Sequence, residues 1–460
     1  MNVESGTRKW WALAGLTLAV LAVGVDGTVL SVALPTLATA LRASESDLQW
    51  FSSGYLLVLA AAMLPAGLLG DRFGRKKVLL ASLALFGLGS AACAFSSTVG
   101  EFVASRVLLG CAGAGVIVSV LSALTVVFTK EERPRAVGIW SAANFVAFPI
   151  GPILGGFLLT HYWWGWVFLM NVPVIVIGLV ATITLVPESR AASAPGLDPA
   201  GMAGSAGGLV ALTYGLIDAG QNGWGDPAAW LLMVLGVALL GGFLLWERRL
   251  VRRPGGQPLL DVGLFASRSY LWGVVLAALA VLALMGVLFT MPQYFQGVAG
   301  TSAMSSGVRL LPLVAGLLLG ALPAAGVARV LGAKVAAAGG FALLAAGLAL
   351  GATTGVASGS WFVAAWMALT GAGMGLAMAT AASAALAELS EDRAGVGSAA
   401  MQALNKLGGP FGSAVLGSVL SAGYLARLGE LPFLPAATRA TAKASIFGGV
   451  AVARHIDSAT

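Results

Sequence analysis

Long apolar segments alternate with short polar stretches along almost the whole chain. Each segment contains about the 20 residues that a helix needs to cross a bilayer core of roughly 30 Å. Hydropathy and the Gly and Pro residues between segments place thirteen of them near 10–31, 49–70, 78–97, 102–128, 136–160, 165–186, 199–218, 229–246, 270–295, 304–328, 333–353, 360–386 and 396–422. The pattern predicts an all-α integral membrane protein.

The composition agrees with this prediction. Hydrophobic residues make up 58% of the 460 residues, charged residues make up only 10%, and the mean hydropathy is +0.91. So few polar groups cannot cover the surface of a water-soluble globule. Cys93 and Cys111 both lie in apolar segments, which favours two small buried side chains over a structural disulfide.

The basic residues predict an orientation. Most of the 26 Lys and Arg residues fall in alternate loops that share one face, whereas the other face has only Arg42 before residue 422. Cytoplasmic loops carry the excess of basic residues, so we expect the N-terminus in the cytoplasm and the protein in the plasma or inner membrane. The net charge of +7 is dispersed among these loops rather than gathered into one patch, which argues against a nucleic-acid partner.

The sequence also contains a weak internal repeat. A shift of 260 residues aligns "FVASRVLLGCAGAG" with "FVAAWMALTGAGMG" and pairs Arg106 with Trp366. A shift of 258 residues pairs Pro65 with Pro323, Gly74 with Gly332, and Gly151-Pro152 with Gly409-Pro410. These matches keep chain order across four helices, as in transporters built from two related halves around a midplane site.

The repeat predicts two pseudo-symmetric six-helix bundles with two inserted helices between them. The first bundle occupies 10–186, the inserted pair 199–246, and the second bundle 270–460. By the register of the repeat, the second bundle has five clear helices and lacks its sixth, because 421–460 contains only a short apolar run. We therefore expect the last helix to be missing and the chain to stop before a fourteenth span.

Four stretches resemble signatures of a known family. "GLLGDRFGRKK" (67–77) resembles the loop between helices two and three of the major facilitator superfamily, and "GIWSAANFVAFPIGPILGG" (138–156) resembles the antiporter motif of its fifth helix. "VDGTVLSVALP" (25–35) and "WGWVFLMNVP" (164–173) resemble signatures of its fourteen-span drug:proton antiporter branch, although Gly165 stands where arginine is usual. The resemblance implies proton-coupled efflux of lipophilic drugs or antibiotics by alternating access. A dedicated exporter of an endogenous natural product or a lipid is the alternative.

The loop at 67–77 concentrates charge in an apolar chain. Its glycines permit close helix approach and a tight turn, and Asp71 can accept hydrogen bonds from helix ends or from Arg75. We interpret the set as a conformational latch that holds the halves together in the outward-open state, with an ordinary basic loop as the alternative. The latch residues are Gly67, Asp71, Arg72, Gly74 and Arg75.

The antiporter-like stretch removes side-chain bulk from the predicted helix at 136–160. Pro152 interrupts one backbone hydrogen bond, which permits a bend, and the glycines permit tight packing against a partner helix. We interpret these residues as a specialised hinge or seal, and the generic packing of small residues between membrane helices is the alternative interpretation. The residues concerned are Gly138, Gly151, Pro152, Gly155 and Gly156.

Asp26 is the one carboxylate well inside the first six predicted helices. An ionisable group within a span is expensive and normally faces a cavity or a partner. Arg106 lies at a comparable depth in its own helix, so the two side chains are expected to interact. The proton and the Arg106 guanidinium compete for the Asp26 carboxylate. A substrate or a conformational change that alters this competition would couple proton uptake to transport. A fixed structural ion pair is the alternative.

In the second half, Lys406 lies near the middle of the predicted helix at 396–422. It can titrate, pair with an anionic substrate group or with a carboxylate, or extend to the interface. A mostly apolar cavity with a few polar groups suits bulky amphipathic substrates. The candidate substrate-binding residues are Gln49, Trp50, Tyr55, Asn144, Gln293, Tyr294, Gln296, Trp366, Gln402, Asn405 and Lys406.

Other function classes find less support in the sequence. No GxxxxGK[ST] stretch is present to bind nucleotide, and His161 and His455 both fall outside the predicted spans, so the residues support neither a metal site nor a buried histidine base. A receptor that binds ligand without transport remains a competing interpretation. We expect no cofactor, no metal and no enzymatic activity. We expect the protein to be a monomer. Its expected partners are the lipid bilayer, a small lipophilic substrate and protons.

Overall fold

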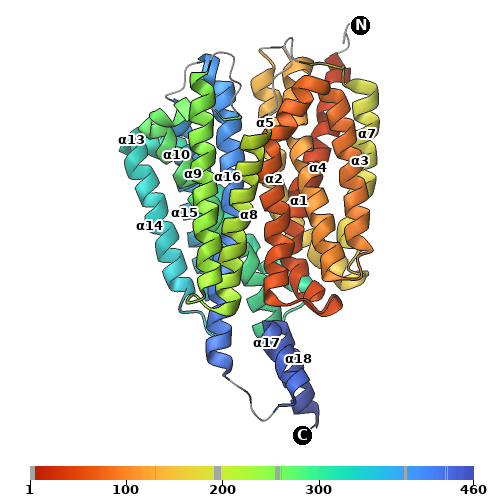
Figure 1. The fold of residues 1–460 in the computed structure, drawn as a ribbon, viewed down its shortest axis with the longest axis vertical. Helices are drawn as coiled ribbons and strands as arrows, with labels where there is room; N and C mark the ends of the chain where they lie inside the picture. Colours follow the sequence, from red (N-terminus) through yellow and green to blue (C-terminus); the bar gives the residue numbers. More distant parts are fainter. Residues whose placement is uncertain are drawn as a thin grey trace.

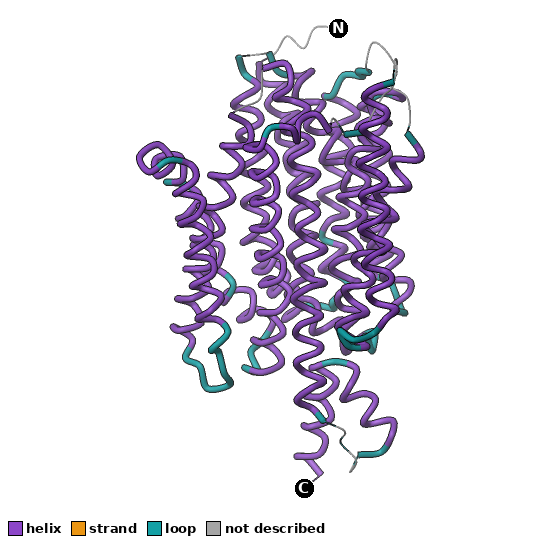
Figure 2. Tube along the Cα trace, turned by 60° about the vertical axis from the view of Figure 1, so that its left-hand side comes forward, coloured by secondary structure: helices purple, strands orange, loops and turns teal. Residues whose placement is uncertain are grey.

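A computed structural model describes residues 6–129, 131–190, 198–253, 259–260, 262–387, 391–429, 431 and 434–459. The described chain is helical almost throughout, with its loops mainly at the two ends of one elongated bundle (Figures 1 and 2). Eleven of its helices are long and apolar enough to cross a membrane, and the bent helix α2 raises the number to twelve. The remaining predicted span corresponds to α5, whose apolar part, Val146–His161, is shorter.

The first helices pack against one another and are here called the N-terminal bundle. They are α1 (Gly6–Ala40), α2 (Glu45–Phe73), α3 (Arg75–Ala94), α4 (Val99–Val127), α5 (Arg133–His161), α6 (Trp166–Leu169) and α7 (Asn171–Leu185). The predicted span at 165–186 is thus broken into α6 and α7 at Met170. The largest buried apolar cluster of the described chain lies mainly within this bundle.

The next helices, α8 (Pro199–Asn222) and α9 (Pro227–Arg252), form an antiparallel pair. In Figure 1 they cross the front of the molecule between the two larger groups. Helix α8 packs on α2 and α16, whereas α9 packs mainly on α8 and exposes large apolar side chains such as Leu231, Val234 and Leu245. A helix with an exposed apolar surface of this kind is suited to contact with lipid.

The C-terminal bundle is defined here as α10 to α16, and two short helices follow it. The elements are η1 (Val262–Ala266), α10 (Arg268–Gln293), η2 (Tyr294–Val298), α11 (Ala303–Arg309), α12 (Leu311–Ala321), α13 (Ala324–Leu331), α14 (Ala333–Gly351), α15 (Ser360–Ala387), α16 (Glu391–Leu428), α17 (Ala436–Ala444) and α18 (Ile446–Ala459). With 9 and 14 residues, α17 and α18 are both shorter than a membrane-spanning helix.

Two positions of the internal repeat have similar local geometry. Helix α2 bends by 46° at Pro65, and the chain breaks between α12 and α13 at Pro323. A proline inside a helix removes one donor and clashes with the preceding turn, which explains both interruptions. Gly74 and Gly332 then connect to the next helix with φ angles of 110° and 84°, a region that favours glycine.

The end of the bundle where α1 begins is called the basic face. Helices α1 and α2 are antiparallel neighbours, so the turn between α2 and α3 returns to this face. Here Lys9 forms an ion pair with Glu132. The hydrogen bond from Lys9 holds the pKa of the Glu132 carboxyl below its ordinary value. Helices α17 and α18 lie at the opposite end of the molecule (Figure 1).

Glycines permit close approach between helices of the C-terminal bundle. A Cβ atom added at Gly340 in α14 would lie 2.6 Å from the backbone nitrogen of Ala377 in α15, whereas one added at the adjacent Gly339 would meet no atom within 4 Å. We expect Gly340→Ala to destabilise the protein by about 1–3 kcal/mol, because the backbone of α15 must move. The apparent melting temperature in detergent should fall by several degrees.

Gly339→Ala is the matched control, and it should leave the melting temperature unchanged or raise it slightly because alanine favours the helix. Equal melting temperatures for the two variants would contradict the packing account of the seam between α14 and α15.

Candidate functional site

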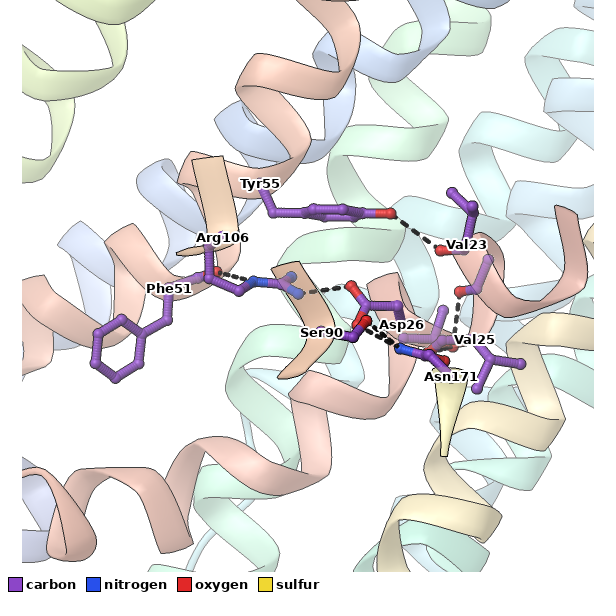
Figure 3. A network of polar contacts seen from close by, with 10 residues as sticks. Val23, Val25, Asp26, Phe51, Tyr55, Ser90, Arg106 and Asn171 are labelled. Atoms are coloured by element: carbon purple, nitrogen blue, oxygen red, sulfur yellow. Dashed lines mark hydrogen bonds and ion pairs between the residues drawn. The ribbon is translucent and has the colours of Figure 1, made fainter. Parts of the chain in front are cut away.

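A buried ion pair joins two helices of the N-terminal bundle. Arg106 Nη1 in α4 lies 2.6 Å from Asp26 Oδ2 in α1, and both residues are 0% exposed (Figure 3). The sequence predicted both residues and their interaction, and the structure brings them together. Neither side chain contacts lipid, because both lie in the interior of the bundle.

Helix α2 supplies two further contacts to the guanidinium. Arg106 Nε donates a hydrogen bond of 3.1 Å to the carbonyl oxygen of Phe51. The guanidinium carbon lies 4.2 Å from the centre of the Tyr55 ring, within the range of a cation–π interaction. The Tyr55 hydroxyl donates to the carbonyl oxygen of Val23 at 3.0 Å, which ties the ring back to α1.

The second oxygen of the Asp26 carboxylate has a partner that the sequence analysis did not name. Asn171 Nδ2, at the start of α7, donates to Asp26 Oδ1 at 3.1 Å and lies 3.3 Å from Ser90 Oγ in α3. The network therefore joins α1, α2, α3, α4 and α7. Asn171 lies within the quoted stretch 164–173, and a polar amide inside an apolar segment was the available signal for it.

A small cavity of about 80 Å³, here called the central cavity, lies between the two bundles. Its walls come from α1, α2, α4 and α5 on one side and from Met285 of α10 and Lys406 of α16 on the other. Tyr55 lines this cavity and also stacks on Arg106, so it connects the cavity to the ion pair. Asp26 itself does not line the cavity.

A larger cavity of about 440 Å³ lies within the C-terminal bundle and extends to Ile446 of α18. Three predicted substrate-binding residues, Gln293, Tyr294 and Trp366, line it. The Tyr294 hydroxyl donates to the carbonyl oxygen of Gly355 at 3.0 Å. The buried indole nitrogen of Trp366 has no hydrogen-bond partner among the described residues.

Hydrogen bonds between the two bundles gather at the end away from the basic face. Gln293 Nε2 donates to Glu45 Oε1 at 3.1 Å, and Gln296 Nε2 donates to the carbonyl oxygen of Val32 at 3.1 Å. Nearer the centre, Ser53 Oγ lies 2.7 Å from Ser413 Oγ. Glu45 is 4% exposed and was missed, because its position before the predicted span at 49–70 suggested a solvated loop residue.

The other predicted substrate-binding residues lie elsewhere. Gln49 is buried with its Oε1 3.5 Å from Ser418 Oγ, and Trp50 packs on the ring of Tyr214 in α8. Gln402 is partly buried, and the buried Asn405 Oδ1 has no partner among the described residues. The side chain of Asn144 lies outside the described residues. Of the predicted substrate-binding residues whose side chains are described, only Tyr55 and Lys406 line the central cavity.

The predicted latch residues contact their own bundle. Arg75 Nε and Nη2 donate to Asp71 Oδ1 at 3.0 and 2.8 Å. The backbone nitrogen of Arg75 donates to the carbonyl oxygen of Ser189, which follows α7, at 2.8 Å. The Arg72 guanidinium lies 5.7 Å from the centre of the Phe73 ring, and Gly67 packs close to Val118 of α4. None of these contacts reaches the C-terminal bundle.

Most glycines of the antiporter-like stretch lie at close helix contacts. A Cβ added at Gly151 or Gly155 would overlap α1 at Thr28 or Val29, and one added at Gly156 would lie 2.7 Å from the Met304 Cα of α11. The carbonyl of Pro152 packs against Gly307, also in α11. Gly138 has no such neighbour within 4 Å, so close packing does not explain a glycine there.

Known proteins share the sequence and the fold. A protein of Streptomyces glaucescens called "Tetracenomycin C resistance and export protein" is 35% identical over 415 residues, which cover 90% of this chain and 76% of the relative. "Methyl viologen resistance protein SmvA" of Salmonella typhimurium is 33% identical over 98% of this chain and 90% of its own. The fold is similar to that of a bacterial homologue of the human lysosomal transporter Spinster, which was solved in an inward-facing, unoccupied conformation. The two structures superpose with a TM-score of 0.68 at 16% sequence identity. The superposition covers 98% of this chain and 89% of the Spinster homologue.

The family described as Major Facilitator Superfamily matches residues 16–413, most of the chain. Together with relatives of this similarity, the match shows that the chain belongs to the major facilitator superfamily.

Proposed function

We propose that the protein exports lipophilic drugs or antibiotics across the cytoplasmic membrane in exchange for protons, as a monomer with its N-terminus in the cytoplasm. The name of the tetracenomycin relative refers to resistance and export and supports the direction of transport, and the names of both relatives refer to resistance to a small toxic compound. The excess of basic residues on one face supports the orientation. The single observation that carries proton coupling is the Asp26–Arg106 pair, buried in the N-terminal bundle and connected to the central cavity.

The coupling proposed here is a competition for the Asp26 carboxylate. Protonation of Asp26 removes its charge and weakens its bond to Arg106. The guanidinium then depends more on the Phe51 carbonyl and the Tyr55 ring. A substrate in the central cavity contacts the same Tyr55, so its binding and the protonation of Asp26 affect each other through one side chain.

The contacts between the bundles support alternating access. In the proposed orientation, the bonds of Gln293 and Gln296 lie near the outer end, so this conformation is closed toward the outside. Opening to the outside requires these bonds to break while the cytoplasmic ends approach. In that motion the glycines of α5 act as a seam against α1 and α11, and the Asp71 turn acts as the latch at the cytoplasmic end.

Dedicated export of a natural product is a second candidate function. The relative named for tetracenomycin C resistance and export favours it. Transport of only one compound from a panel of chemically unrelated compounds would indicate dedicated export, whereas transport of several would indicate multidrug efflux.

The first test removes the proposed proton carrier. In proteoliposomes with an imposed pH gradient, we expect Asp26→Asn to abolish gradient-driven transport of whichever of the dyes fluorescein and rhodamine 6G the wild type exports. Exchange of dye across the membrane without a gradient should continue, because exchange needs no net proton movement. The readout is dye fluorescence over time, with and without a proton uncoupler.

Two further proteins make this test specific. Asp26→Asn leaves Arg106 buried without a counter-charge, which can cost about 3–5 kcal/mol, so the double variant Asp26→Asn with Arg106→Gln checks for a folding defect. Asp218→Asn is the matched control, because Asp218 only accepts a bond from Asn222 at the end of α8. Gradient-driven transport by Asp26→Asn at the wild-type rate would show that Asp26 is not the proton carrier.

The second test concerns the latch. We expect Asp71→Asn to reduce efflux by at least about tenfold, a change of about 1.4 kcal/mol, while membrane insertion is unchanged. The physical reason is the loss of the charged acceptor for Arg75 at the turn between α2 and α3. Lys77→Gln in the first turn of α3 is the control, because Lys77 is exposed. Wild-type efflux by Asp71→Asn at equal expression contradicts the latch.

A further inference from the structure

The central cavity contains one charged side chain that the coupling scheme does not use. Lys406 lies in α16, three residues before Gly409, and lines the cavity opposite Tyr55 and Phe148. Most of the other lining residues are apolar, and none is acidic. Lys406 is therefore the one formal charge among the described residues that line this cavity.

Lys406 has no counter-charge within the described part of the chain. No described carboxylate oxygen lies within 4.0 Å of its ammonium. The Asp26 carboxylate is paired with Arg106 and Asn171, and one oxygen of the Glu45 carboxylate accepts a hydrogen bond from Gln293. An ammonium placed among apolar side chains without a partner is costly, so a partner from outside the chain is strongly favoured.

The hydroxyl groups of the cavity wall are also engaged with the backbone. Thr28 Oγ1 donates toward the carbonyl oxygens of Gly24, Val25 and Ala147 at 3.1–3.2 Å. The Tyr55 hydroxyl donates to Val23. The strongest unpaired donor that the wall offers a ligand is therefore Lys406, surrounded by the apolar surfaces of Phe148, Leu56 and Met285.

We propose that Lys406 forms a subsite for the anionic oxygen, carboxylate or phenolate, of lipophilic substrates with an aromatic or aliphatic body. A cavity of about 80 Å³ holds a group of that size, and the body of the substrate occupies space that opens as the bundles separate. The same charge disfavours lipophilic cations, because like charges in an apolar site repel strongly. This inference rests on the proposed export function, since it names the class of substrate exported.

The test compares two xanthene dyes of opposite charge, fluorescein, an anion, and rhodamine 6G, a cation. Binding to purified protein is measured by fluorescence anisotropy. The wild type should bind fluorescein more tightly than rhodamine 6G. Lys406→Met, which keeps the length of the side chain, should weaken fluorescein binding by about tenfold or more, the effect of losing one charge-assisted hydrogen bond. It should leave rhodamine 6G binding unchanged or strengthen it.

Lys406→Arg should retain fluorescein binding, because it keeps the charge. Lys77→Met at the exposed start of α3 controls for a general effect of charge removal. A melting temperature of Lys406→Met at or above the wild-type value excludes misfolding, and removal of a partly buried charge without a counter-charge among the described residues predicts that result. Equal weakening of both dyes, no weakening of either, or no fluorescein binding by the wild type would overturn the subsite.

Binding needs no proton gradient, so this test separates the subsite from the export function. Lys406-dependent fluorescein binding without gradient-driven transport of either dye would retain the subsite and contradict the proposed function. Gradient-driven export of rhodamine 6G without fluorescein binding would support the proposed function and overturn the subsite.

Discussion

The buried pair of Asp26 and Arg106 is the interaction on which the N-terminal bundle depends. Taking two charges out of water costs more than their mutual attraction returns unless further hydrogen bonds satisfy the remaining atoms. Asn171, the Phe51 carbonyl and the Tyr55 ring supply those contacts. Phe51 and Tyr55 belong to α2 and Asn171 to α7, so the pair and these contacts join four helices, and the bond from Asn171 to Ser90 adds α3. The bundle can therefore move as a unit, and in the proposed coupling its central carboxylate would exchange its bond to Arg106 for a proton.

The two bundles carry different chemistry. Arg106 has Trp366 as its counterpart in the repeat, so the C-terminal bundle has an indole where the N-terminal bundle has a guanidinium. Trp366 lines an apolar cavity of about 440 Å³, and the charged residue that this bundle presents to the centre is Lys406. We interpret the difference as a division of labour in which the N-terminal bundle would hold the proton site and the C-terminal bundle would add a charged group to a substrate cavity that both bundles line. Tyr55 contacts both the central cavity and the ion pair, and it links the two tasks.

The sequence predicted the all-helical membrane fold and the meeting of Asp26 with Arg106. Both followed from strong signals, since apolar segments of spanning length are unmistakable and a charge inside one needs a partner. The sequence could not separate residues by the direction in which they point. Trp50 and Tyr55 lie in the same helix, yet Trp50 packs on α8 whereas Tyr55 faces the cavity. Hydropathy gives the depth of a residue in a segment, and its direction depends on packing that only the folded chain determines.

The most direct test of the central claim is substrate-induced infrared difference spectroscopy of the purified protein. It detects a change in the protonation of a carboxyl group without any transport. On addition of whichever xanthene dye the wild type exports, the account predicts a change in the protonated-carboxyl band that is absent from Asp26→Asn. The same band change in both proteins, or no carboxyl change in the wild type, would contradict a proton site at Asp26 that responds to substrate.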